Sequence, residues 1–226
     1  MSDSVLCDFV ISHPNGVHIK DAKNGSYLLC NQKPLENFGL TKTEQLIGQN
    51  VFDADKFMRP YWGNNYAEQI AEMDYMVKTR HEVFTKKYNV SINAHNKIYI
   101  QDITKIPLVS SFNKVTAILT ILNDHTKKAN YFYLLDLYKN MYPNQAIGLS
   151  SFIKYLGLSD FFQEHLTYRE ITCLLHMRLD SSRKSIANKL NIGVKTVETH
   201  ISHITGKLKY GRLSTILNHL RSQEIL

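Results

Sequence analysis

The sequence has few cysteines and no long apolar run. Cys7, Cys30 and Cys173 are odd in number and far apart, so they predict neither a disulfide framework nor a cysteine metal site. No apolar stretch approaches the roughly 18 residues that a membrane-spanning helix needs, and no signal-peptide pattern is found. We therefore expect a cytoplasmic protein without a membrane partner.

Motifs that support catalysis are also lacking. The sequence has no phosphate-binding glycine loop, no Gly-x-Ser-x-Gly turn and no paired-carboxylate motif. His200 and His203 can share one helical turn, but no third ligand accompanies them, so no metal site is predicted. An enzyme is therefore the least favoured class, and the sequence leaves any cofactor unknown.

Positive charge is concentrated near the end of the chain. The 226 residues carry a net charge of +7. From Glu164 onward, ten Lys and Arg stand against five Asp and Glu, so most of the excess lies in the last quarter. This distribution is typical of a segment that meets a polyanion such as DNA.

Residues 194–208 have the pattern of an amphipathic helix. Their apolar residues are spaced three, four, three and four apart, which places them on one buried face: Val194, Val197, Ile201, Ile204 and Leu208. The opposite face carries short hydrogen-bonding groups with Lys and His beside them, which suit base edges and phosphates. The pattern predicts a helix that enters the major groove of DNA.

The segments around this helix complete a small helical domain. Ser182 can cap a helix over 183–190, and Asn191-Ile192-Gly193 forms a tight turn in which Gly193 tolerates unusual backbone angles. Upstream, Thr167 and Glu170 have the spacing of a capping box and predict a helix to Leu179. A fourth apolar stripe follows over 213–220. The order predicts a helix-turn-helix unit within four helices.

Three motifs in order resemble the LuxR-type (GerE-type) DNA-binding domain. They are Leu166-Thr-Tyr-Arg-Glu170, Ser185-Ile-Ala-Asn-Lys-Leu190, and Lys195-Thr-Val-Glu-Thr-His200 followed by Lys207-Leu208. The resemblance implies that the third helix reads the major groove and that the fourth contributes to a dimer interface. It also implies two sets of DNA contacts. The base-facing residues are Glu198, Thr199 and Ser202, and the phosphate contacts are Lys195, Thr196, His203 and Lys207.

The N-terminal part reads as an α+β domain. A hairpin is predicted over 17–29 around Asn24-Gly25, followed by helices over 32–38, 43–47 and 65–78. Three β-rich runs follow, over 81–92, 98–109 and 115–123. Two strands, several helices and three strands predict a five-stranded antiparallel sheet with helices on one face.

This order, with Pro14-Asn-Gly-Val-His-Ile-Lys20, Phe38-Gly39-Leu40 and Asn123-Asp-His-Thr126, resembles a PAS domain over about residues 8 to 127. The resemblance implies a small pocket that senses a ligand or supports dimerisation. A cysteinyl-flavin adduct is not expected, because Gly48-Gln49-Asn50 is followed by Val51 rather than cysteine. The predicted pocket residues are Ile19, Phe38, Met58, Tyr66, Ile70 and Met73.

The expected organisation is a sensor domain over 1–127, a helical linker over 128–163 and a DNA-binding domain over 164–226. A helix is predicted from Lys127 to Tyr142, and Pro143 ends it. Its apolar side comprises Tyr131, Leu134, Leu135, Tyr138 and Met141. This side either faces a second copy in a dimer or packs back on its own sheet.

The sequence thus predicts a sequence-specific transcriptional regulator that binds double-stranded DNA as a homodimer. Its PAS-like domain senses a small ligand or a partner and controls the geometry of the dimer. RNA polymerase and a small molecule are further partners compatible with this class. The alternatives are an acyl-homoserine-lactone quorum sensor and a helix-turn-helix that binds protein rather than DNA. A phosphorylated response regulator is disfavoured because alternating parallel βα units are lacking.

Overall fold

The computed structural model describes residues 3–180 and 182–223. The chain divides into two compact units, Met1–Lys127 and Lys128–Leu226, and each is described by itself. None of the helices in the described ranges has the length and apolar character needed to cross a bilayer.

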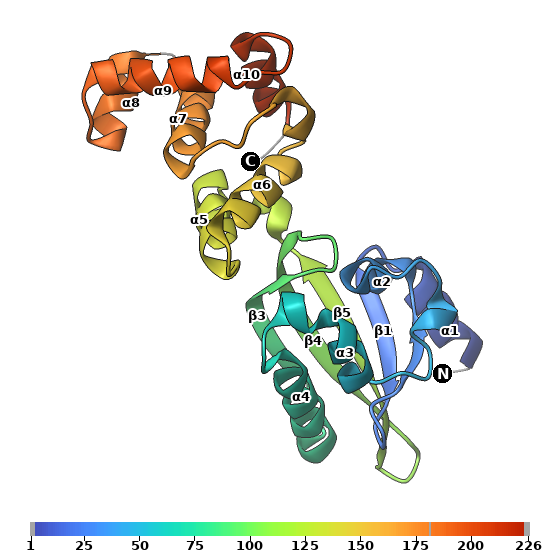
Figure 1. The fold of residues 1–226 in the computed structure, drawn as a ribbon. Helices are drawn as coiled ribbons and strands as arrows, with labels where there is room; N and C mark the ends of the chain where they lie inside the picture. Colours follow the sequence, from blue (N-terminus) through green and yellow to red (C-terminus); the bar gives the residue numbers. More distant parts are fainter. Residues whose placement is uncertain (1–2, 181, 224–226) are drawn as a thin grey trace. The chain divides into compact units, whose positions relative to one another are not determined.

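The N-terminal unit is built on a five-stranded antiparallel sheet (Figure 1). The strands are β1 Gly16–Asp21, β2 Tyr27–Cys30, β3 Phe84–Ile92, β4 Ile98–Val109 and β5 Val115–Asp124. Their order in the sheet is β2-β1-β5-β4-β3, so the last strand lies at the centre. The predicted PAS-like sheet is confirmed.

Helices cover both faces of this sheet, so the prediction that they lie on one face is wrong. α2 Gln32–Phe38, α3 Val51–Trp62 and α4 Tyr66–Arg80 follow β2 and lie on one side, with the 3-10 turn η1 Thr43–Gln45 between them. α1 Asp3–Ser12 packs Leu6 and Val10 against Val17, Ile19 and Leu119. Because neighbouring side chains of a strand point to opposite faces, these strand residues form a second apolar face that needs its own cover.

The C-terminal unit is helical. A 3-10 turn, η2 Thr126–Lys128, links it to the last strand. Its helices are α5 Tyr131–Met141, α6 Gln145–Tyr155, α7 Tyr168–Leu179, α8 Arg183–Leu190, α9 Val194–Gly206 and α10 Leu213–Ser222, with η3 Ser159–Phe161 between α6 and α7. The predicted helices of the helix-turn-helix and its neighbours are confirmed.

The apolar side of α5 is covered inside its own unit. Tyr131, Leu134, Leu135 and Tyr138 are buried, and the helices that contact α5 are α6 and α7. Most of this side is therefore covered by neighbouring helices of the C-terminal unit, and a role of the 128–163 segment in a dimer stays a prediction.

Helices α5 and α6 approach closely at a glycine. A Cβ built on Gly148 would lie 1.9 Å from the carbonyl oxygen of Tyr138, which is backbone and cannot turn aside. In contrast, a Cβ on Gly206, at the end of α9, would meet nothing within 4 Å. The two glycines therefore differ in whether the fold requires them.

We predict that Gly148→Ala lowers the free energy of unfolding by about 1–3 kcal/mol or more, the usual cost of overpacking a core. Gly206→Ala is the matched control and leaves stability unchanged or slightly raised, because it only limits the freedom of the unfolded chain. Thermal and urea unfolding measure both. Equal melting temperatures for the two variants would contradict the close packing of α5 on α6.

Candidate DNA-binding surface and ligand pocket

The helix-turn-helix is held by side-chain caps. Thr167 Oγ1 accepts from the Glu170 amide at 3.3 Å, and Glu170 Oε2 accepts from the Thr167 amide at 2.7 Å. This confirms the predicted capping box. Ser182 caps α8 by accepting from the Ser185 amide.

The turn between α8 and α9 differs from the prediction in one detail. Asn191, not Gly193, takes the left-handed conformation, with φ of +52°. Gly193 is extended, with φ of −71°, and occupies the N-cap position of α9. Asparagine tolerates the left-handed region because its short side chain can hydrogen-bond locally. The turn therefore needs no glycine at 193 for its backbone angles.

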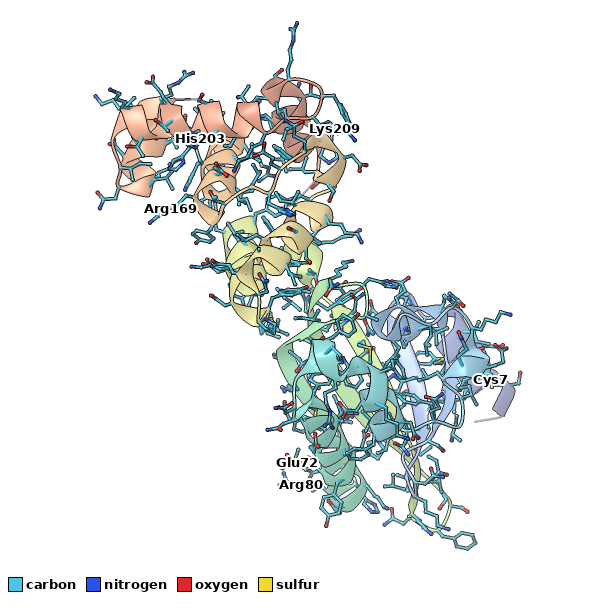
Figure 2. The ribbon with its side chains drawn as sticks, viewed as in Figure 1. Cys7, Glu72, Arg80, Arg169, His203 and Lys209 are labelled. Atoms are coloured by element: carbon cyan, nitrogen blue, oxygen red, sulfur yellow. The ribbon has the colours of Figure 1, made fainter. Side chains whose placement is uncertain are left out.

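Helix α9 turns its polar face outward. Val197 and Ile204 are buried, whereas Val194, predicted to be buried, is 40% exposed at the first turn. Six of the seven residues predicted to contact DNA are exposed on this helix (His203 is labelled in Figure 2): Lys195, Thr196, Glu198, Thr199, Ser202 and His203. The helix thus offers polar and charged groups on one accessible side.

Lys207, the seventh predicted contact, is used inside the domain instead. Its ammonium donates to Glu170 Oε2 at 2.8 Å, to Glu170 Oε1 at 3.1 Å and to the His165 carbonyl at 3.0 Å. These bonds occupy all three of its hydrogens. The structure therefore corrects the predicted phosphate contact, because the buried carboxylate of Glu170 needs a counter-charge.

The hydrogen bonds from Lys207 and Thr167 also affect the pKa of the Glu170 carboxyl group. Burial would raise the pKa of Glu170, but the hydrogen bonds from Lys207 and Thr167 outweigh it and hold the pKa below its ordinary value. The carboxylate is therefore charged at neutral pH, and its stabilising effect is lost only as the pH falls through that lowered value.

Two exposed basic residues of α8 are not among the predicted DNA contacts. Arg183 and Lys184 are exposed in the first turn of α8, and Arg183 Nε lies 3.9 Å from Glu198 Oε1. Thr199 Oγ1 donates to the Lys195 carbonyl at 3.0 Å and keeps its acceptor capacity. Only the fold brings the start of α8 next to Glu198, so no local pattern identifies Arg183.

The fourth helix of the domain, α10, is partly used for internal packing. Ile216 and Leu220 of its predicted stripe are buried, and α10 contacts α7. Arg178 Nε donates to the Leu220 carbonyl at 2.8 Å, and Gln223 Nε2 donates to the Leu156 carbonyl at 2.9 Å. The helix is thereby tied to α6 and α7.

The N-terminal unit contains a cavity of about 50 Å³ between the sheet and helices α2 to α4. Of the predicted pocket residues, Phe38, Tyr66 and Ile70 line it, whereas Ile19, Met58 and Met73 do not. Ile19 belongs to the sheet face under α1, and Met58 packs in a cluster with Leu35 and Leu46. Met73 is buried away from the lining.

Buried polar residues of the strands also line the cavity and were missed. They are His18 and Lys20 of β1, Gln101 and Lys105 of β4, and Thr120 of β5. Their spacing of two or four within a strand places each set on one face of the sheet. Polar residues at alternate positions of predicted strands were the signal that could have found them.

The carboxylate of Asp74 accepts hydrogen bonds from two buried lysines at this cavity. Asp74 Oδ2 accepts from Lys20 Nζ at 3.0 Å, and Asp74 Oδ1 accepts from Lys105 Nζ. Burial and the nearby Lys20 lower the pKa of Lys105 to about 8 despite this bond. Burial and the two lysines lower the pKa of His18 well below its ordinary value, so its ring is neutral at pH 7.

The C-terminal match to a known family is now clear. Residues 164–219 match the model of the bacterial regulatory proteins of the luxR family. This segment is a LuxR-family domain. No curated protein sequence matches the chain.

Some solved structures are similar to nearly the whole chain, and others are similar to its N-terminal part. The VqmA–ligand–DNA complex of Vibrio cholera is 19% identical, with a TM-score of 0.48, covering 99% of this chain and 88% of that one. The PAS domain of Bordetella pertussis BvgS is 20% identical, with a TM-score of 0.47, covering 60% of this chain and 93% of that one.

We predict that Lys207→Met lowers the free energy of unfolding by about 3 kcal/mol, because it leaves the Glu170 carboxylate buried without its partner. The double variant Lys207→Met with Glu170→Gln recovers part of this loss. Exposed Lys209, labelled in Figure 2, supplies the control Lys209→Met, which stays within about 0.5 kcal/mol of the parent. Loss of DNA affinity in Lys207→Met at unchanged thermal stability would instead restore the phosphate contact.

Proposed function

We propose that this protein is a sequence-specific transcriptional regulator that binds double-stranded DNA as a homodimer. The observation that carries the proposal is the exposed polar face of α9, presented by a helix-turn-helix of the LuxR family. The first 127 residues form the sensor, 128–163 a helical connection, and 164–226 the DNA-binding domain. Signal binding in the sensor changes how two recognition helices are spaced, and thereby transcription.

The contacts on DNA follow from the exposed side of α9. Glu198, Thr199 and Ser202 face base edges, where their oxygens accept or donate hydrogen bonds. Lys195, Thr196 and His203 lie beside them and contact phosphates, which position the helix without reading sequence. Two such helices in a dimer match half-sites about one turn of DNA apart, roughly 34 Å.

The sensor role is supported by the cavity in the N-terminal unit. Small-molecule sites are concave and combine apolar walls with a few polar groups that fix orientation. This cavity combines Phe38, Trp62 and Ile70 with His18 and Lys105. Its volume of about 50 Å³ and its buried charges suit a small polar molecule better than a lactone with a long acyl chain, which disfavours the quorum-sensor alternative.

We predict that Thr199→Ala changes sequence preference, with about 1–3 kcal/mol lost on the preferred site and little on random DNA. Lys195→Ala weakens binding to all sequences and reduces the salt dependence by about one phosphate contact. Selection from random DNA followed by binding across a salt series measures both effects.

Thr205→Ala is the matched control for the base-facing position. Thr205 is exposed on the same helix and makes the same type of bond, to the Ile201 carbonyl at 2.8 Å. It lies six residues beyond Thr199, about 9 Å further along the helix axis and past the last predicted base contact, Ser202. Equal losses for Thr199→Ala, Lys195→Ala and Thr205→Ala on both kinds of DNA would contradict the assignment of this face.

The two-unit mechanism is tested with the full chain and with residues 128–226, which form a compact unit. We expect the full chain to select a two-fold symmetric site more tightly, because the N-terminal unit supplies part of the dimer. Tighter binding by the shorter chain would instead make the N-terminal unit an inhibitor. Salt-insensitive binding by both would favour a protein-interaction module over a DNA reader.

A further inference from the structure

A row of buried polar groups crosses the centre of the sheet. Thr120 of β5 is in register with His18 of β1 on one side and with Lys105 of β4 on the other. All three side chains are at least nine-tenths buried and line the cavity. They therefore present an imidazole, a hydroxyl and an ammonium to the same small space.

Two members of this row lack partners within the protein. Among the residues that the structure describes, no group hydrogen-bonds either ring nitrogen of His18 or the hydroxyl oxygen of Thr120. Buried polar groups are almost always hydrogen-bonded, and each exception calls for an explanation such as a bound molecule. Since both groups line the cavity, a ligand in it can supply the missing bonds.

The buried charges around the cavity sum to an excess of positive charge. Lys20 and Lys105 share the single carboxylate of Asp74, and each gives it one hydrogen bond. The two ammonium groups and one carboxylate leave one positive charge in excess in a buried place, which is costly without a counter-charge. A ligand with one negative charge would balance it.

The opposite wall of the cavity is apolar and aromatic. Phe38, Trp62 and Tyr66 line it and contact one another, with ring centroids 5.6 Å apart for Phe38 and Trp62 and 4.9 Å apart for Trp62 and Tyr66. Ile70 of α4 completes this wall. A ligand that fits both walls therefore has a charged end toward the sheet and a short apolar end toward the helices.

We propose that the cavity binds a small organic monoanion, a carboxylic acid with a short apolar remainder. Its carboxylate accepts hydrogen bonds from Lys105, Thr120 and the ring N–H of His18, and its remainder packs against Phe38, Trp62 and Ile70. This names the ligand class of the sensor and so rests on the proposed function, but the binding itself is measured without DNA.

The protein contains an intrinsic fluorescent probe of ligand binding in the cavity. Trp62 is the single tryptophan of the chain and lines the cavity, so its fluorescence reports occupancy in the full-length protein. Acetate and propionate are titrated beside their neutral amides and beside chloride and phosphate. We expect saturable binding of at least one carboxylate and at least tenfold weaker binding of its amide and of the inorganic anions. Equal binding of amide and acid, or no saturable carboxylate binding, would overturn the proposal.

The pH dependence provides a second readout. The ionisable groups around the charged end are Lys20, Lys105, Asp74, Tyr27, Tyr66 and His18. Because the pKa of Lys105 is about 8, its charge is lost between pH 7 and 9, whereas burial raises the pKa of both tyrosines away from this range. Carboxylate affinity should fall severalfold over this interval, and binding at pH 8 should take up protons. Affinity that stays constant to pH 9 would contradict the role of Lys105.

Two variants separate binding from folding. Thr120→Val keeps the shape and removes a hydroxyl that the fold leaves unpartnered, so the free protein should melt at the same or a higher temperature. Lys105→Met leaves Lys20 and Asp74 as a balanced pair and should likewise fold. We expect both to weaken carboxylate binding at least tenfold, while Lys114→Met, an exposed lysine of the same sheet region, leaves it unchanged. Parent-like binding by both cavity variants would exclude this site.

The regulatory link is measured separately. The bound carboxylate should change the affinity of the full chain for its selected DNA site, and Thr120→Val should abolish that change without altering DNA binding in the absence of ligand. Failure of DNA binding with intact carboxylate binding would refute the proposed function alone. Intact DNA binding with no carboxylate binding would refute the ligand class alone.

Discussion

The surface that we propose to face DNA depends on one buried ion pair. The Glu170 carboxylate caps the start of α7 through the Thr167 amide and accepts two hydrogen bonds from Lys207, just beyond α9. Because a buried carboxylate without a partner is strongly destabilising, the end of α9 is held against α7. Val197 and Ile204 then face inward, and the short polar residues between them face out. The proposed recognition surface therefore depends on a contact inside the domain.

The N-terminal unit uses buried charge in the opposite way. Its cavity places two lysines on one aspartate and leaves His18 and Thr120 without bonds among the described residues. In the C-terminal domain, Glu170 and Lys207 are matched and hold two helices together. In the N-terminal unit, the excess positive charge is what we propose a bound carboxylate to balance. Removing one partner of a balanced buried pair destabilises a fold, whereas an unbalanced group of buried charges in a cavity marks a candidate binding site.

Features predicted well from the sequence have local causes. The capping box at Thr167 and the cap at Ser182 involve residues three apart, and period-two patterns mark strands.

Helix α3 was missed although Asn50 and Asp53 form a capping box with the same spacing. Helix α1 was missed because its apolar residues do not form one clean stripe; Val5, Phe9 and Ile11 stay exposed while Val10 is buried. Ile19 was placed at the pocket although it faces α1, because alternation separates the two faces of a strand but does not say which face meets the cavity.

The sequence by itself determined the helix-turn-helix and the antiparallel sheet, since caps, turns and periodicity act over a few residues. Only the tertiary structure decided which charged side chains pair with one another inside the protein and which remain available to a ligand or to DNA. Lys207 meets Glu170 across 37 positions of the chain, and Lys20 meets Asp74 across 54. Register across three strands places His18, Thr120 and Lys105 in one row. Burial and charge pairing depend on such distant neighbours, so no local pattern in the chain contains them.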